Sequence, residues 1–372
     1  MMKVAGIMSG TSLDGIDVAV VEIGGRRGFA TLAKSTTAYP KTLRAALLAV
    51  SNRETHTAAI ARLHFLLPEL YAEAVRRLGV AVDLIGCHGQ TIFHEGTPIR
   101  FHGRRIASTL QIGDGAVLAE RTGVPVVSDF RTADIAAGGR GAPLVPFVDY
   151  HLFRHARRGR VALNLGGIAN ITAIPPGAPP EDVIAFDTGP ANMVIDGLVA
   201  RHTGGKRTFD KGGKIALRGT VDRELLDRLL RDRYYRQAPP KTAGREQYGE
   251  EFLAAFAPLA LEDAVATATA LTAATVAASI ERFVRPRMPV DDLIVSGGGA
   301  HNPRILAFLT ALLPGIAIRV SSDYGIDVDA KEAVAFAILA HQTWQGRAAN
   351  LPSATGAGHP AILGKISYPP PR

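Results

Sequence analysis

The chain has 372 residues, enough for about two domains with a sizeable core. Its 47% hydrophobic and 20% charged residues are typical of folded globular proteins and exclude a disordered chain. The formal net charge of +8 suits an anionic ligand, but the arginines are scattered and aromatic residues make up only 6%. We therefore expect no nucleic-acid partner.

The single cysteine, Cys87, excludes an internal disulfide framework and fits a reducing compartment. The first apolar stretch is broken at Ser9 and Asp14, which does not match a signal peptide. The uncharged stretch 264–280 consists largely of Ala and Thr, so we expect a buried helix and no membrane partner.

The chain begins with two predicted strands, residues 3–8 and 16–23, joined by a glycine-rich turn. Glycines let backbone N–H groups approach an anion, hydroxyl groups add donors, and a carboxylate can hold a metal ion that bridges phosphates. The turn therefore predicts a phosphate-binding loop, and the alternative is a hairpin turn without a ligand. The candidate residues are Gly10, Thr11, Ser12, Leu13, Asp14, Gly15, Ile16 and Asp17.

A third strand at 29–37 and two helices at 41–51 and 57–78 follow. The next predicted strand, 83–87, runs into His88, Gly89, Gln90 and Thr91, and the end of a buried strand is where open α/β sheets place ligand contacts. A metal site formed by His88, His94 and His102 lacks the spacing of known ligand motifs, so we do not expect one.

A helix at 115–122 and a strand at 124–127 come next, and we expect a domain boundary near residue 123. The residues from Ser128 to Asp134 predict a loop, which leads into the glycine-rich stretch 136–143. With Arg131, Asp134 and Arg140 beside it, this region is either a ligand-facing segment or a solvated connection between domains.

The second half repeats the first in outline. Strands at 160–165 and 171–174 flank a turn that contains Gly166, Gly167 and Asn170. Two such hairpins, each followed by helices, indicate an internally duplicated α/β fold with two domains. A nucleotide is expected in the cleft between these domains.

A buried strand at 183–186 is expected to place Asp187 at its end, followed by a helix. Thr188 is a candidate cap for that helix, and Pro190 suits its first turn. Asp187 is therefore free to act as a general base, although a helix-capping role is the alternative.

The remaining pattern predicts a helix at 222–231, a long Ala/Thr helix ending near 284, and a strand at 291–295. That strand ends in the glycine run Gly297, Gly298 and Gly299, which lets a nucleoside approach the backbone. A strand at 316–320 and a helix at 330–344 follow. The expected domains are 1–123 with the returning segment 341–372, and 124–340.

Taken together, these segments resemble the actin-like ATPase and sugar kinase superfamily and, more closely, the anhydro-N-acetylmuramic acid kinase family. The resemblance covers nearly the whole chain. It rests on the motifs Gly6-x-Met8-Ser9-Gly10-Thr11-Ser12-x-Asp14-Gly15-x-Asp17, His88-Gly89-Gln90-Thr91, Asp129-Phe130-Arg131 with Asp134, Asn164-x-Gly166-Gly167-x-Ala169-Asn170, Phe186-Asp187-Thr188-Gly189-Pro190 and Ser296-Gly297-Gly298-Gly299. The chain departs from the usual pattern of that family at two positions, Arg140 and Ala191. Both lie beside the motifs and bear on detailed substrate contacts.

This resemblance implies a duplicated actin-like (ribonuclease H-like) fold and ATP as cofactor, with Mg²⁺ that Asp14 holds directly or through water. A homodimer and a cytoplasmic role in recycling bacterial cell-wall sugar are implied as well. It also implies that Asp187 activates water for attack on the anomeric carbon of a 1,6-anhydro sugar, whose O6 then takes the γ-phosphate. The candidate sugar-binding residues are His88, Gln90, Thr91, Arg131, Asp134 and Glu332. An ordinary sugar kinase and an actin-like nucleotide-gated clamp are the alternatives.

Overall fold

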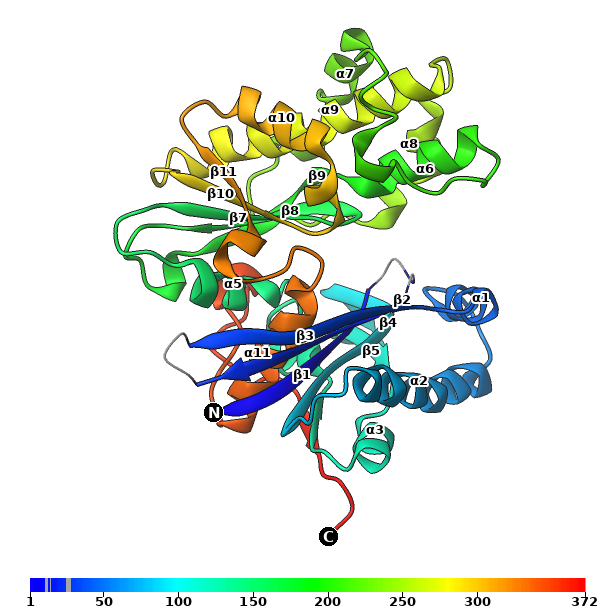
Figure 1. Ribbon diagram of the computed structural model, residues 1–372, viewed down its shortest axis with the longest axis vertical. Helices are drawn as coiled ribbons and strands as arrows, with labels where there is room; N and C mark the ends of the chain where they lie inside the picture. Colours follow the sequence, from blue (N-terminus) through cyan, green and yellow to red (C-terminus); the bar gives the residue numbers. More distant parts are fainter. Residues whose placement is uncertain (11–12, 14, 25–27, 372) are drawn as a thin grey trace. The chain divides into compact units, whose positions relative to one another are not determined.

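The computed structural model describes residues 1–10, 13, 15–24 and 28–371. Three residues of the first predicted phosphate loop, Thr11, Ser12 and Asp14, lie outside the described residues. The chain divides into two compact units, shown in Figure 1. Unit 1 comprises Met1–Val148 with Ala330–Arg372, and unit 2 comprises Asp149–Asp329.

Unit 1 contains a seven-stranded sheet in which β12, β6, β4, β1, β2 and β3 are neighbours in that order, and β5 pairs with β4. β1, β2 and β3 are antiparallel, whereas β4 is parallel to β1 and β6 is parallel to β4. The strands are β1 (Met2–Ser9), β2 (Gly15–Ile23), β3 (Phe29–Ala38), β4 (Leu84–Phe101), β5 (Arg104–Ile112), β6 (Val126–Ser128) and β12 (Lys365–Ser367).

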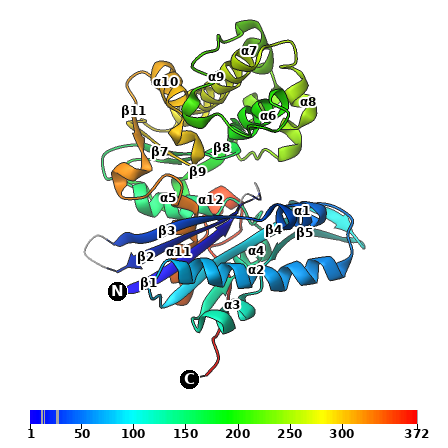
Figure 2. The ribbon, with the colours of Figure 1, turned by 45° about the vertical axis from the view of Figure 1, so that its right-hand side comes forward.

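Helices cover both faces of this sheet. Leu67 and Tyr71 of α2 share a core with Ala5 and Ile7 of β1, so α1, α2 and α3 pack on one face (Figure 2). The opposite face carries α11. The helices of unit 1 are α1 (Lys41–Val50), α2 (Thr57–Arg77), α3 (Gly115–Thr122), α4 (Phe130–Ala136), α11 (Lys331–Trp344) and α12 (Pro352–Thr355), while α5 (Val145–Phe153) spans the boundary between the units.

α11 lies unusually close to the sheet, because two paired glycines face it. Gly6 of β1 and Gly86 of β4 are register partners. A Cβ atom at Gly6 would lie 1.8 Å from the carbonyl oxygen of Ala333, and one at Gly86 would lie 2.2 Å from that of Phe336. The two glycines therefore form a flat surface on which the backbone of α11 rests.

Unit 2 repeats the strand arrangement of unit 1. Its sheet has the order β11, β10, β7, β8, β9, with β7, β8 and β9 antiparallel and β10 and β11 parallel to β7. Unit 1 shows the same order in β6, β4, β1, β2 and β3, which confirms the duplicated α/β fold. The strands are β7 (Arg160–Leu165), β8 (Ile168–Ile174), β9 (Ile184–Pro190), β10 (Asp292–Ser296) and β11 (Ala317–Val320).

The long Ala/Thr helix forms the centre of the unit 2 core. The segment Leu261–Val284 is long and apolar enough to cross a membrane, but 83% of its most apolar window is buried inside the structure, as expected for a core helix. Small side chains allow close packing here, since a Cβ at Gly189 of β9 would lie 2.9 Å from Thr275 Oγ1. The helices are α6 (Asn192–His202), α7 (Arg223–Leu229), α8 (Glu250–Ala254), α9 (Leu261–Ser279) with a π-helical extension Ile280–Val284, and α10 (Pro303–Leu312).

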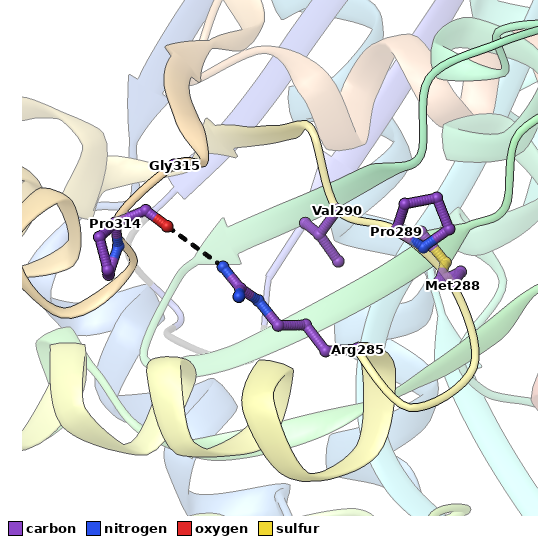
Figure 3. Close-up of a pocket in the computed structure, with 6 residues that line it drawn as sticks. All are labelled: Arg285, Met288, Pro289, Val290, Pro314 and Gly315. Carbon is purple, nitrogen blue, oxygen red and sulfur yellow. Dashed lines mark hydrogen bonds between the residues drawn. The ribbon is translucent and has the colours of Figure 1, made fainter.

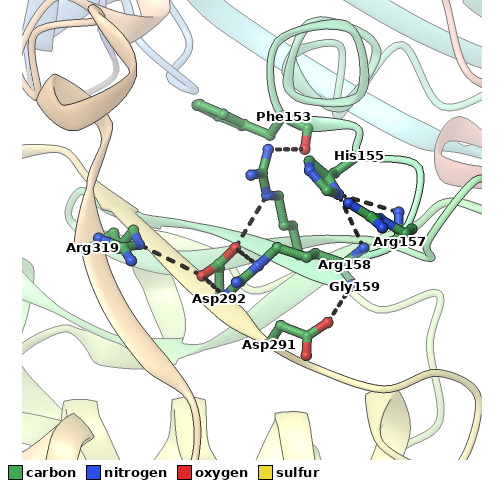
Figure 4. Close-up of polar contacts among 9 residues, drawn as sticks. Phe153, His155, Arg157, Arg158, Gly159, Asp291, Asp292 and Arg319 are labelled. Atoms are coloured by element: carbon green, nitrogen blue, oxygen red, sulfur yellow. Dashed lines mark hydrogen bonds and ion pairs between the residues drawn. The ribbon is translucent and has the colours of Figure 1, made fainter.

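A buried carboxylate at the start of β10 contacts arginines that lie before β7, at the start of β7 and within β11 (Figure 4). Asp292, 1% exposed, accepts hydrogen bonds from Arg158 at 2.6 and 2.9 Å and from Arg160 at 3.2 Å, and Arg319 lies 3.6 Å away. Burial by itself raises the pKa of Asp292, but the guanidinium groups of Arg158 and Arg160 hold it below its ordinary value. The cluster is a structural feature that the sequence pattern did not predict.

Three expectations about the fold are corrected. β4 does not end at Cys87 but continues to Phe101, because β5 supplies an antiparallel ladder for its second half. The expected loop after Ser128 is largely the helix α4. The domain boundaries at 123 and 340 move to 148 and 329, because β6 pairs with β4 and the start of α11 packs on the unit 1 sheet.

The glycine surface under α11 gives the first prediction. Gly6→Ala should lower the free energy of unfolding by about 3 kcal/mol, because the new methyl group has no space against the backbone of α11. Urea denaturation followed by circular dichroism measures this change. Gly358→Ala is the control, since its Cβ would find its nearest neighbour at 3.4 Å. Equal stability of the two variants would contradict the assigned packing.

Candidate functional site

The predicted site residues form two groups, one within each unit. In unit 1 they gather at the β1–β2 turn, on the middle of β4, on α4 and at the start of α11. In unit 2 they gather at the β7–β8 turn, on β9 and after β10.

The described part of the first turn is held by Gln90. Leu13 has a left-handed backbone (φ 59°) and its N–H donates to the Gly10 carbonyl at 3.1 Å. Gln90, fully buried beside Ser9 in the β1–β4 ladder, donates its Nε2 to the same carbonyl at 3.1 Å. Its Oε1 has no hydrogen-bond partner among the described residues. Two motifs far apart in the chain therefore meet here.

The other described residues of the first turn lie on β2. A Cβ at Gly15 would lie 2.3 Å from the carbonyl oxygen of Thr37, so this position requires glycine. Ile16 is buried in the core, whereas Asp17 is partly exposed and its Oδ1 accepts a hydrogen bond from Thr36 Oγ1 at 2.6 Å.

A buried hydroxyl network lies behind the turn, and sequence reasoning missed it. Ser9 Oγ is 3.0 Å from the hydroxyl oxygens of both Tyr39 and Tyr71. Burial raises the pKa of both tyrosines, so their hydroxyl groups stay protonated and can donate. Ser9 lies on β1, Tyr39 directly follows β3 and Tyr71 lies on α2, so no local pattern links them.

His88 and Arg131 form a hydrogen-bonded pair in which His88 is buried and Arg131 is partly exposed. Arg131 donates its Nε to His88 Nε2 at 3.1 Å, and a guanidinium cannot accept a hydrogen bond. His88 Nδ1 must then carry the proton that it donates to the Gly89 carbonyl at 2.8 Å. Burial, reinforced by the charge of Arg131, holds the pKa of His88 well below its ordinary value. His88 is therefore a neutral residue that orients Arg131.

Arg131 itself remains a cation held in place from several sides. It also donates Nη1 to the Gly141 carbonyl at 2.8 Å. Burial lowers the pKa of Arg131 to about 10, whereas the charges of Glu332 and Asp134 favour its cationic form. Glu332 lies near Arg131 because it belongs to the first turn of α11. Phe336 of the same helix packs on His88, with their ring centroids 4.6 Å apart.

Asp134 has a different environment from the other sugar-site candidates. It is fully buried, and its carboxylate accepts from Gly141 N at 2.8 Å, Asn350 Nδ2 at 2.6 Å and Thr355 Oγ1 at 2.7 Å. Both oxygens are thus used to tie α4 to the segment around α12. This geometry favours a role in positioning Arg131 over direct ligand contact.

Thr91 lies on β4 and accepts a hydrogen bond from Gln111 Nε2 of β5 at 3.2 Å. His94 and His102 are exposed on the same hairpin. Over the described ranges, no group of three or more His, Cys, Asp or Glu side chains is arranged to hold a metal ion.

In unit 2 the second turn and the glycine run lie against each other. A Cβ at Gly297 (φ 80°) would lie 2.8 Å from Asn164 Oδ1 and 2.9 Å from Leu165. Asn192, at the start of α6, donates Nδ2 to the Leu165 carbonyl at 3.0 Å, and its N–H bonds the Gly166 carbonyl at 3.0 Å. Asn192 is a further candidate that the sequence did not single out.

The remaining residues of these two segments lie nearby. Gly167 accepts hydrogen bonds from the N–H groups of Ala191 and Met193, Asn170 pairs with Asp187 across β8 and β9, and Gly298 is exposed beside Asn192. A Cβ at Gly299 would lie 2.5 Å from the side chain of Leu165, so this glycine permits close packing.

Asp187 lies within β9 and is held by a distant loop. Its Oδ2 accepts from Ala243 N at 2.8 Å, and its backbone carbonyl accepts from the Tyr234 hydroxyl at 2.8 Å. Burial raises the pKa of Asp187 to about 6, although the Ala243 hydrogen bond and the charge of Lys241 oppose the shift. A carboxylate with such a pKa can accept a proton near neutral pH.

The expected helix cap at Thr188 is wrong. Thr188 is buried in β9 and donates Oγ1 to the Ala169 carbonyl of β8 at 3.2 Å, and Pro190 ends the strand. α6 instead begins at Asn192, with Ala191 as the preceding residue and no side-chain cap. The sheet continues because β8 offers ladder partners through Pro190.

A surface pocket of about 370 Å³ lies elsewhere in unit 2 (Figure 3). Arg285 reaches across it to the carbonyl of Pro314, at 3.3 Å. None of its lining residues is a candidate site residue. They are Arg285, Met288, Pro289, Val290, Pro314 and Gly315.

Comparison with known proteins adds a family match. The model of the family described as anhydro-N-acetylmuramic acid kinase matches residues 2–369. A protein of that name from Caldanaerobacter subterraneus subsp. tengcongensis is 46% identical over 382 residues, covering 98% of this chain and 96% of its own length. One from Salinibacter ruber is 45% identical and covers 99% and 96%.

Solved structures show more distant similarity. The activator of the 2-hydroxyisocaproyl-CoA dehydratase from Clostridium difficile, with bound ADPNP, is 12% identical with a TM-score of 0.44, covering 93% of this chain and 96% of its own.

The His88–Arg131 geometry gives a prediction. Nitrogen-15 NMR of His88 should show the neutral Nδ1–H form from pH 8 down to pH 6, because burial and Arg131 both disfavour protonation. The spectrum of His88→Asn identifies the signal. Since the unfolded chain takes up this proton below a pH of about 6.5, the contribution of His88 to stability should fall as the pH falls. A doubly protonated ring at pH 6 would contradict the assignment.

Asp134 is predicted to stabilise the fold. Asp134→Asn should lower the free energy of unfolding by about 2–3 kcal/mol, because an amide cannot accept from all three buried donors. Urea denaturation measures this, with Asp227→Asn on the exposed face of α7 as the control. A variant of unchanged stability that has lost ligand affinity would instead show that Asp134 contacts the ligand.

Proposed function

This chain belongs to the anhydro-N-acetylmuramic acid kinase family, and from that premise we propose that it converts 1,6-anhydro-N-acetylmuramic acid to N-acetylmuramic acid 6-phosphate with ATP. The family match over residues 2–369 is the observation that carries the proposal. It favours this reaction over the two alternatives left open by the sequence, an ordinary sugar kinase and a nucleotide-gated clamp. The enzyme is a phosphotransferase.

We assign the role of general base to Asp187. A 1,6-anhydro sugar has no free O6 hydroxyl, so the nucleophile at its anomeric carbon is water. Asp187 accepts a proton as the water oxygen bonds to C1, the C1–O6 bond breaks, and O6 takes the γ-phosphoryl group while ADP leaves. The partly buried position of Asp187 and its pKa of about 6 support this role.

We further propose that the unit 1 group binds the sugar. Arg131 is a cation oriented by His88 and the Gly141 carbonyl, and arginine binds carboxylates with two parallel hydrogen bonds. The lactyl carboxylate of the sugar is the matching anion. Glu332 and Gln90, whose Oε1 lacks a partner among the described residues, supply acceptors for sugar hydroxyl groups.

The nucleotide-binding residues are proposed to be those of the two turns and the glycine run. The tight packing of Gly297 and Gly299 on Leu165 supports a preformed surface in unit 2. Mg²⁺ in kinases is bound by one or two carboxylates together with the substrate phosphates. Asp14 is the proposed carboxylate, and the ion would neutralise phosphate charge.

We also propose a cytoplasmic location, supported by the free, buried Cys87. The homodimer implied by the family resemblance stays a prediction.

The proposed reaction predicts the behaviour of Asp187→Asn. Turnover should fall at least about 100-fold while ATP binding is retained, because the amide cannot accept the proton. Release of ADP in the presence of the anhydro sugar measures turnover, and calorimetry measures ATP binding.

In ¹⁸O-labelled water, the product of the unmodified enzyme should carry the label at C1. A product without the label, or a fully active Asp187→Asn enzyme, would contradict the mechanism. Stimulation by free N-acetylmuramic acid alone would favour an ordinary sugar kinase.

A further inference from the structure

A single loop of unit 2 makes three hydrogen bonds with Asp187. Asp187 N donates to the Lys241 carbonyl at 3.2 Å, the Tyr234 hydroxyl donates to the Asp187 carbonyl, and Ala243 N donates to Asp187 Oδ2, the last two at 2.8 Å. The backbone and the carboxylate of one residue are thus bonded to residues 47–56 positions away. We call the segment 234–243 the clamp loop.

Lys241 anchors the clamp loop from inside the unit. Its side chain is only 5% exposed, and Nζ donates to the Tyr234 carbonyl at 3.0 Å. Three rings surround the ammonium group, with centroids at 4.7 Å (Tyr234), 5.0 Å (Phe283) and 5.7 Å (Phe186). These rings replace water around the cation.

The cage also connects Lys241 to the strand that bears the proposed base. Phe186 is the residue before Asp187 on β9, and its ring packs edge to face on Phe283 at 5.8 Å. The ammonium group of Lys241 therefore contacts the ring of Phe186. The backbone carbonyl of Lys241 accepts a hydrogen bond from the N–H of the next residue of β9, Asp187. A displacement of Lys241 would move both contacts.

We propose that Lys241 is a positioning residue for Asp187: its caged cation holds the clamp loop on β9 and favours the ionised form of the carboxylate. This inference rests on the proposed role of Asp187 as the general base. It assigns to a buried lysine a function in setting the pH range of the reaction.

The charges around the pair define that range. Burial, reinforced by the charge of Arg282 in the π-helical extension of α9, lowers the pKa of Lys241 to about 8, whereas the charge of Asp187 opposes the shift. Tyr234 and Tyr248 are the other titratable groups that sense Asp187, and burial keeps both protonated. Between the pKa of Asp187, about 6, and that of Lys241, about 8, Asp187 is a carboxylate and Lys241 is an ammonium ion.

The pH dependence of kcat/KM tests the proposal. The unmodified enzyme should show an acid limb near pH 6 and an alkaline limb near pH 8. In Lys241→Met, whose side chain fits the cage without charge, the acid limb should move up by about one pH unit and the alkaline limb should vanish. At pH 6 this amounts to roughly a fivefold to tenfold loss of kcat/KM beyond any loss at the pH optimum. Lys206→Met, an exposed lysine of the same unit, should behave as the unmodified enzyme.

A surface variant tests the same coupling without entering the core. Arg282 is exposed, and Arg282→Met removes a charge that repels Lys241, so the alkaline limb should move to higher pH while the acid limb stays. This measurement stands even if Lys241→Met fails to fold.

A folded Lys241→Met enzyme with both limbs unchanged would overturn the role of Lys241. A folded Arg282→Met enzyme with an unchanged alkaline limb would do the same. If Asp187→Asn is inactive at the same time, the proposed reaction survives and only the positioning role fails. If Asp187→Asn is active, the proposed base itself is wrong.

Discussion

The approach of α11 to the paired glycines is the constraint on which unit 1 depends. A helix that rests directly on Gly6 and Gly86 places its first turn and its inward side chains at fixed positions. Glu332 then lies near Arg131, and Phe336 packs on the rings of His88 and Phe130. A segment from the C-terminal end of the chain thereby completes a group formed by β4 and α4. Any larger side chain under the helix would displace all of these contacts together.

In unit 2 the proposed base, Asp187, lies inside a strand, where burial disfavours its negative charge. The clamp loop offsets this effect, because it donates a hydrogen bond to the carboxylate and carries the cation Lys241. Burial raises the pKa of Asp187 while the hydrogen bond from Ala243 and the charge of Lys241 lower it, and the balance leaves a pKa of about 6. The aromatic cage matters because a lysine without it would prefer water.

Local patterns in the sequence predicted most of the elements but failed where ladder partners came from elsewhere. Apolar periodicity located β1, β2, β7 and the long core helix α9 closely. The continuation of β4 past His88 was missed, because only pairing with β5 makes that polar segment a strand. Thr188 failed as a helix cap for the same reason, since β8 keeps it in the sheet. The short helix α4 was predicted as a loop, because the glycines that follow Ala136 are typical of irregular structure.

The duplicated α/β plan, the glycine turns and the motifs that identify the family could be predicted from the sequence, because they depend on residue type and on spacing between near neighbours. The contacts of each polar side chain could not, because they form only in the folded chain. Arg131 meets His88 across 43 residues, Asp134 meets Asn350 across 216, and Ala243 meets Asp187 across 56. Such contacts set burial, tautomer and pKa, and no local pattern encodes them, since they arise only when distant strands and loops pack together.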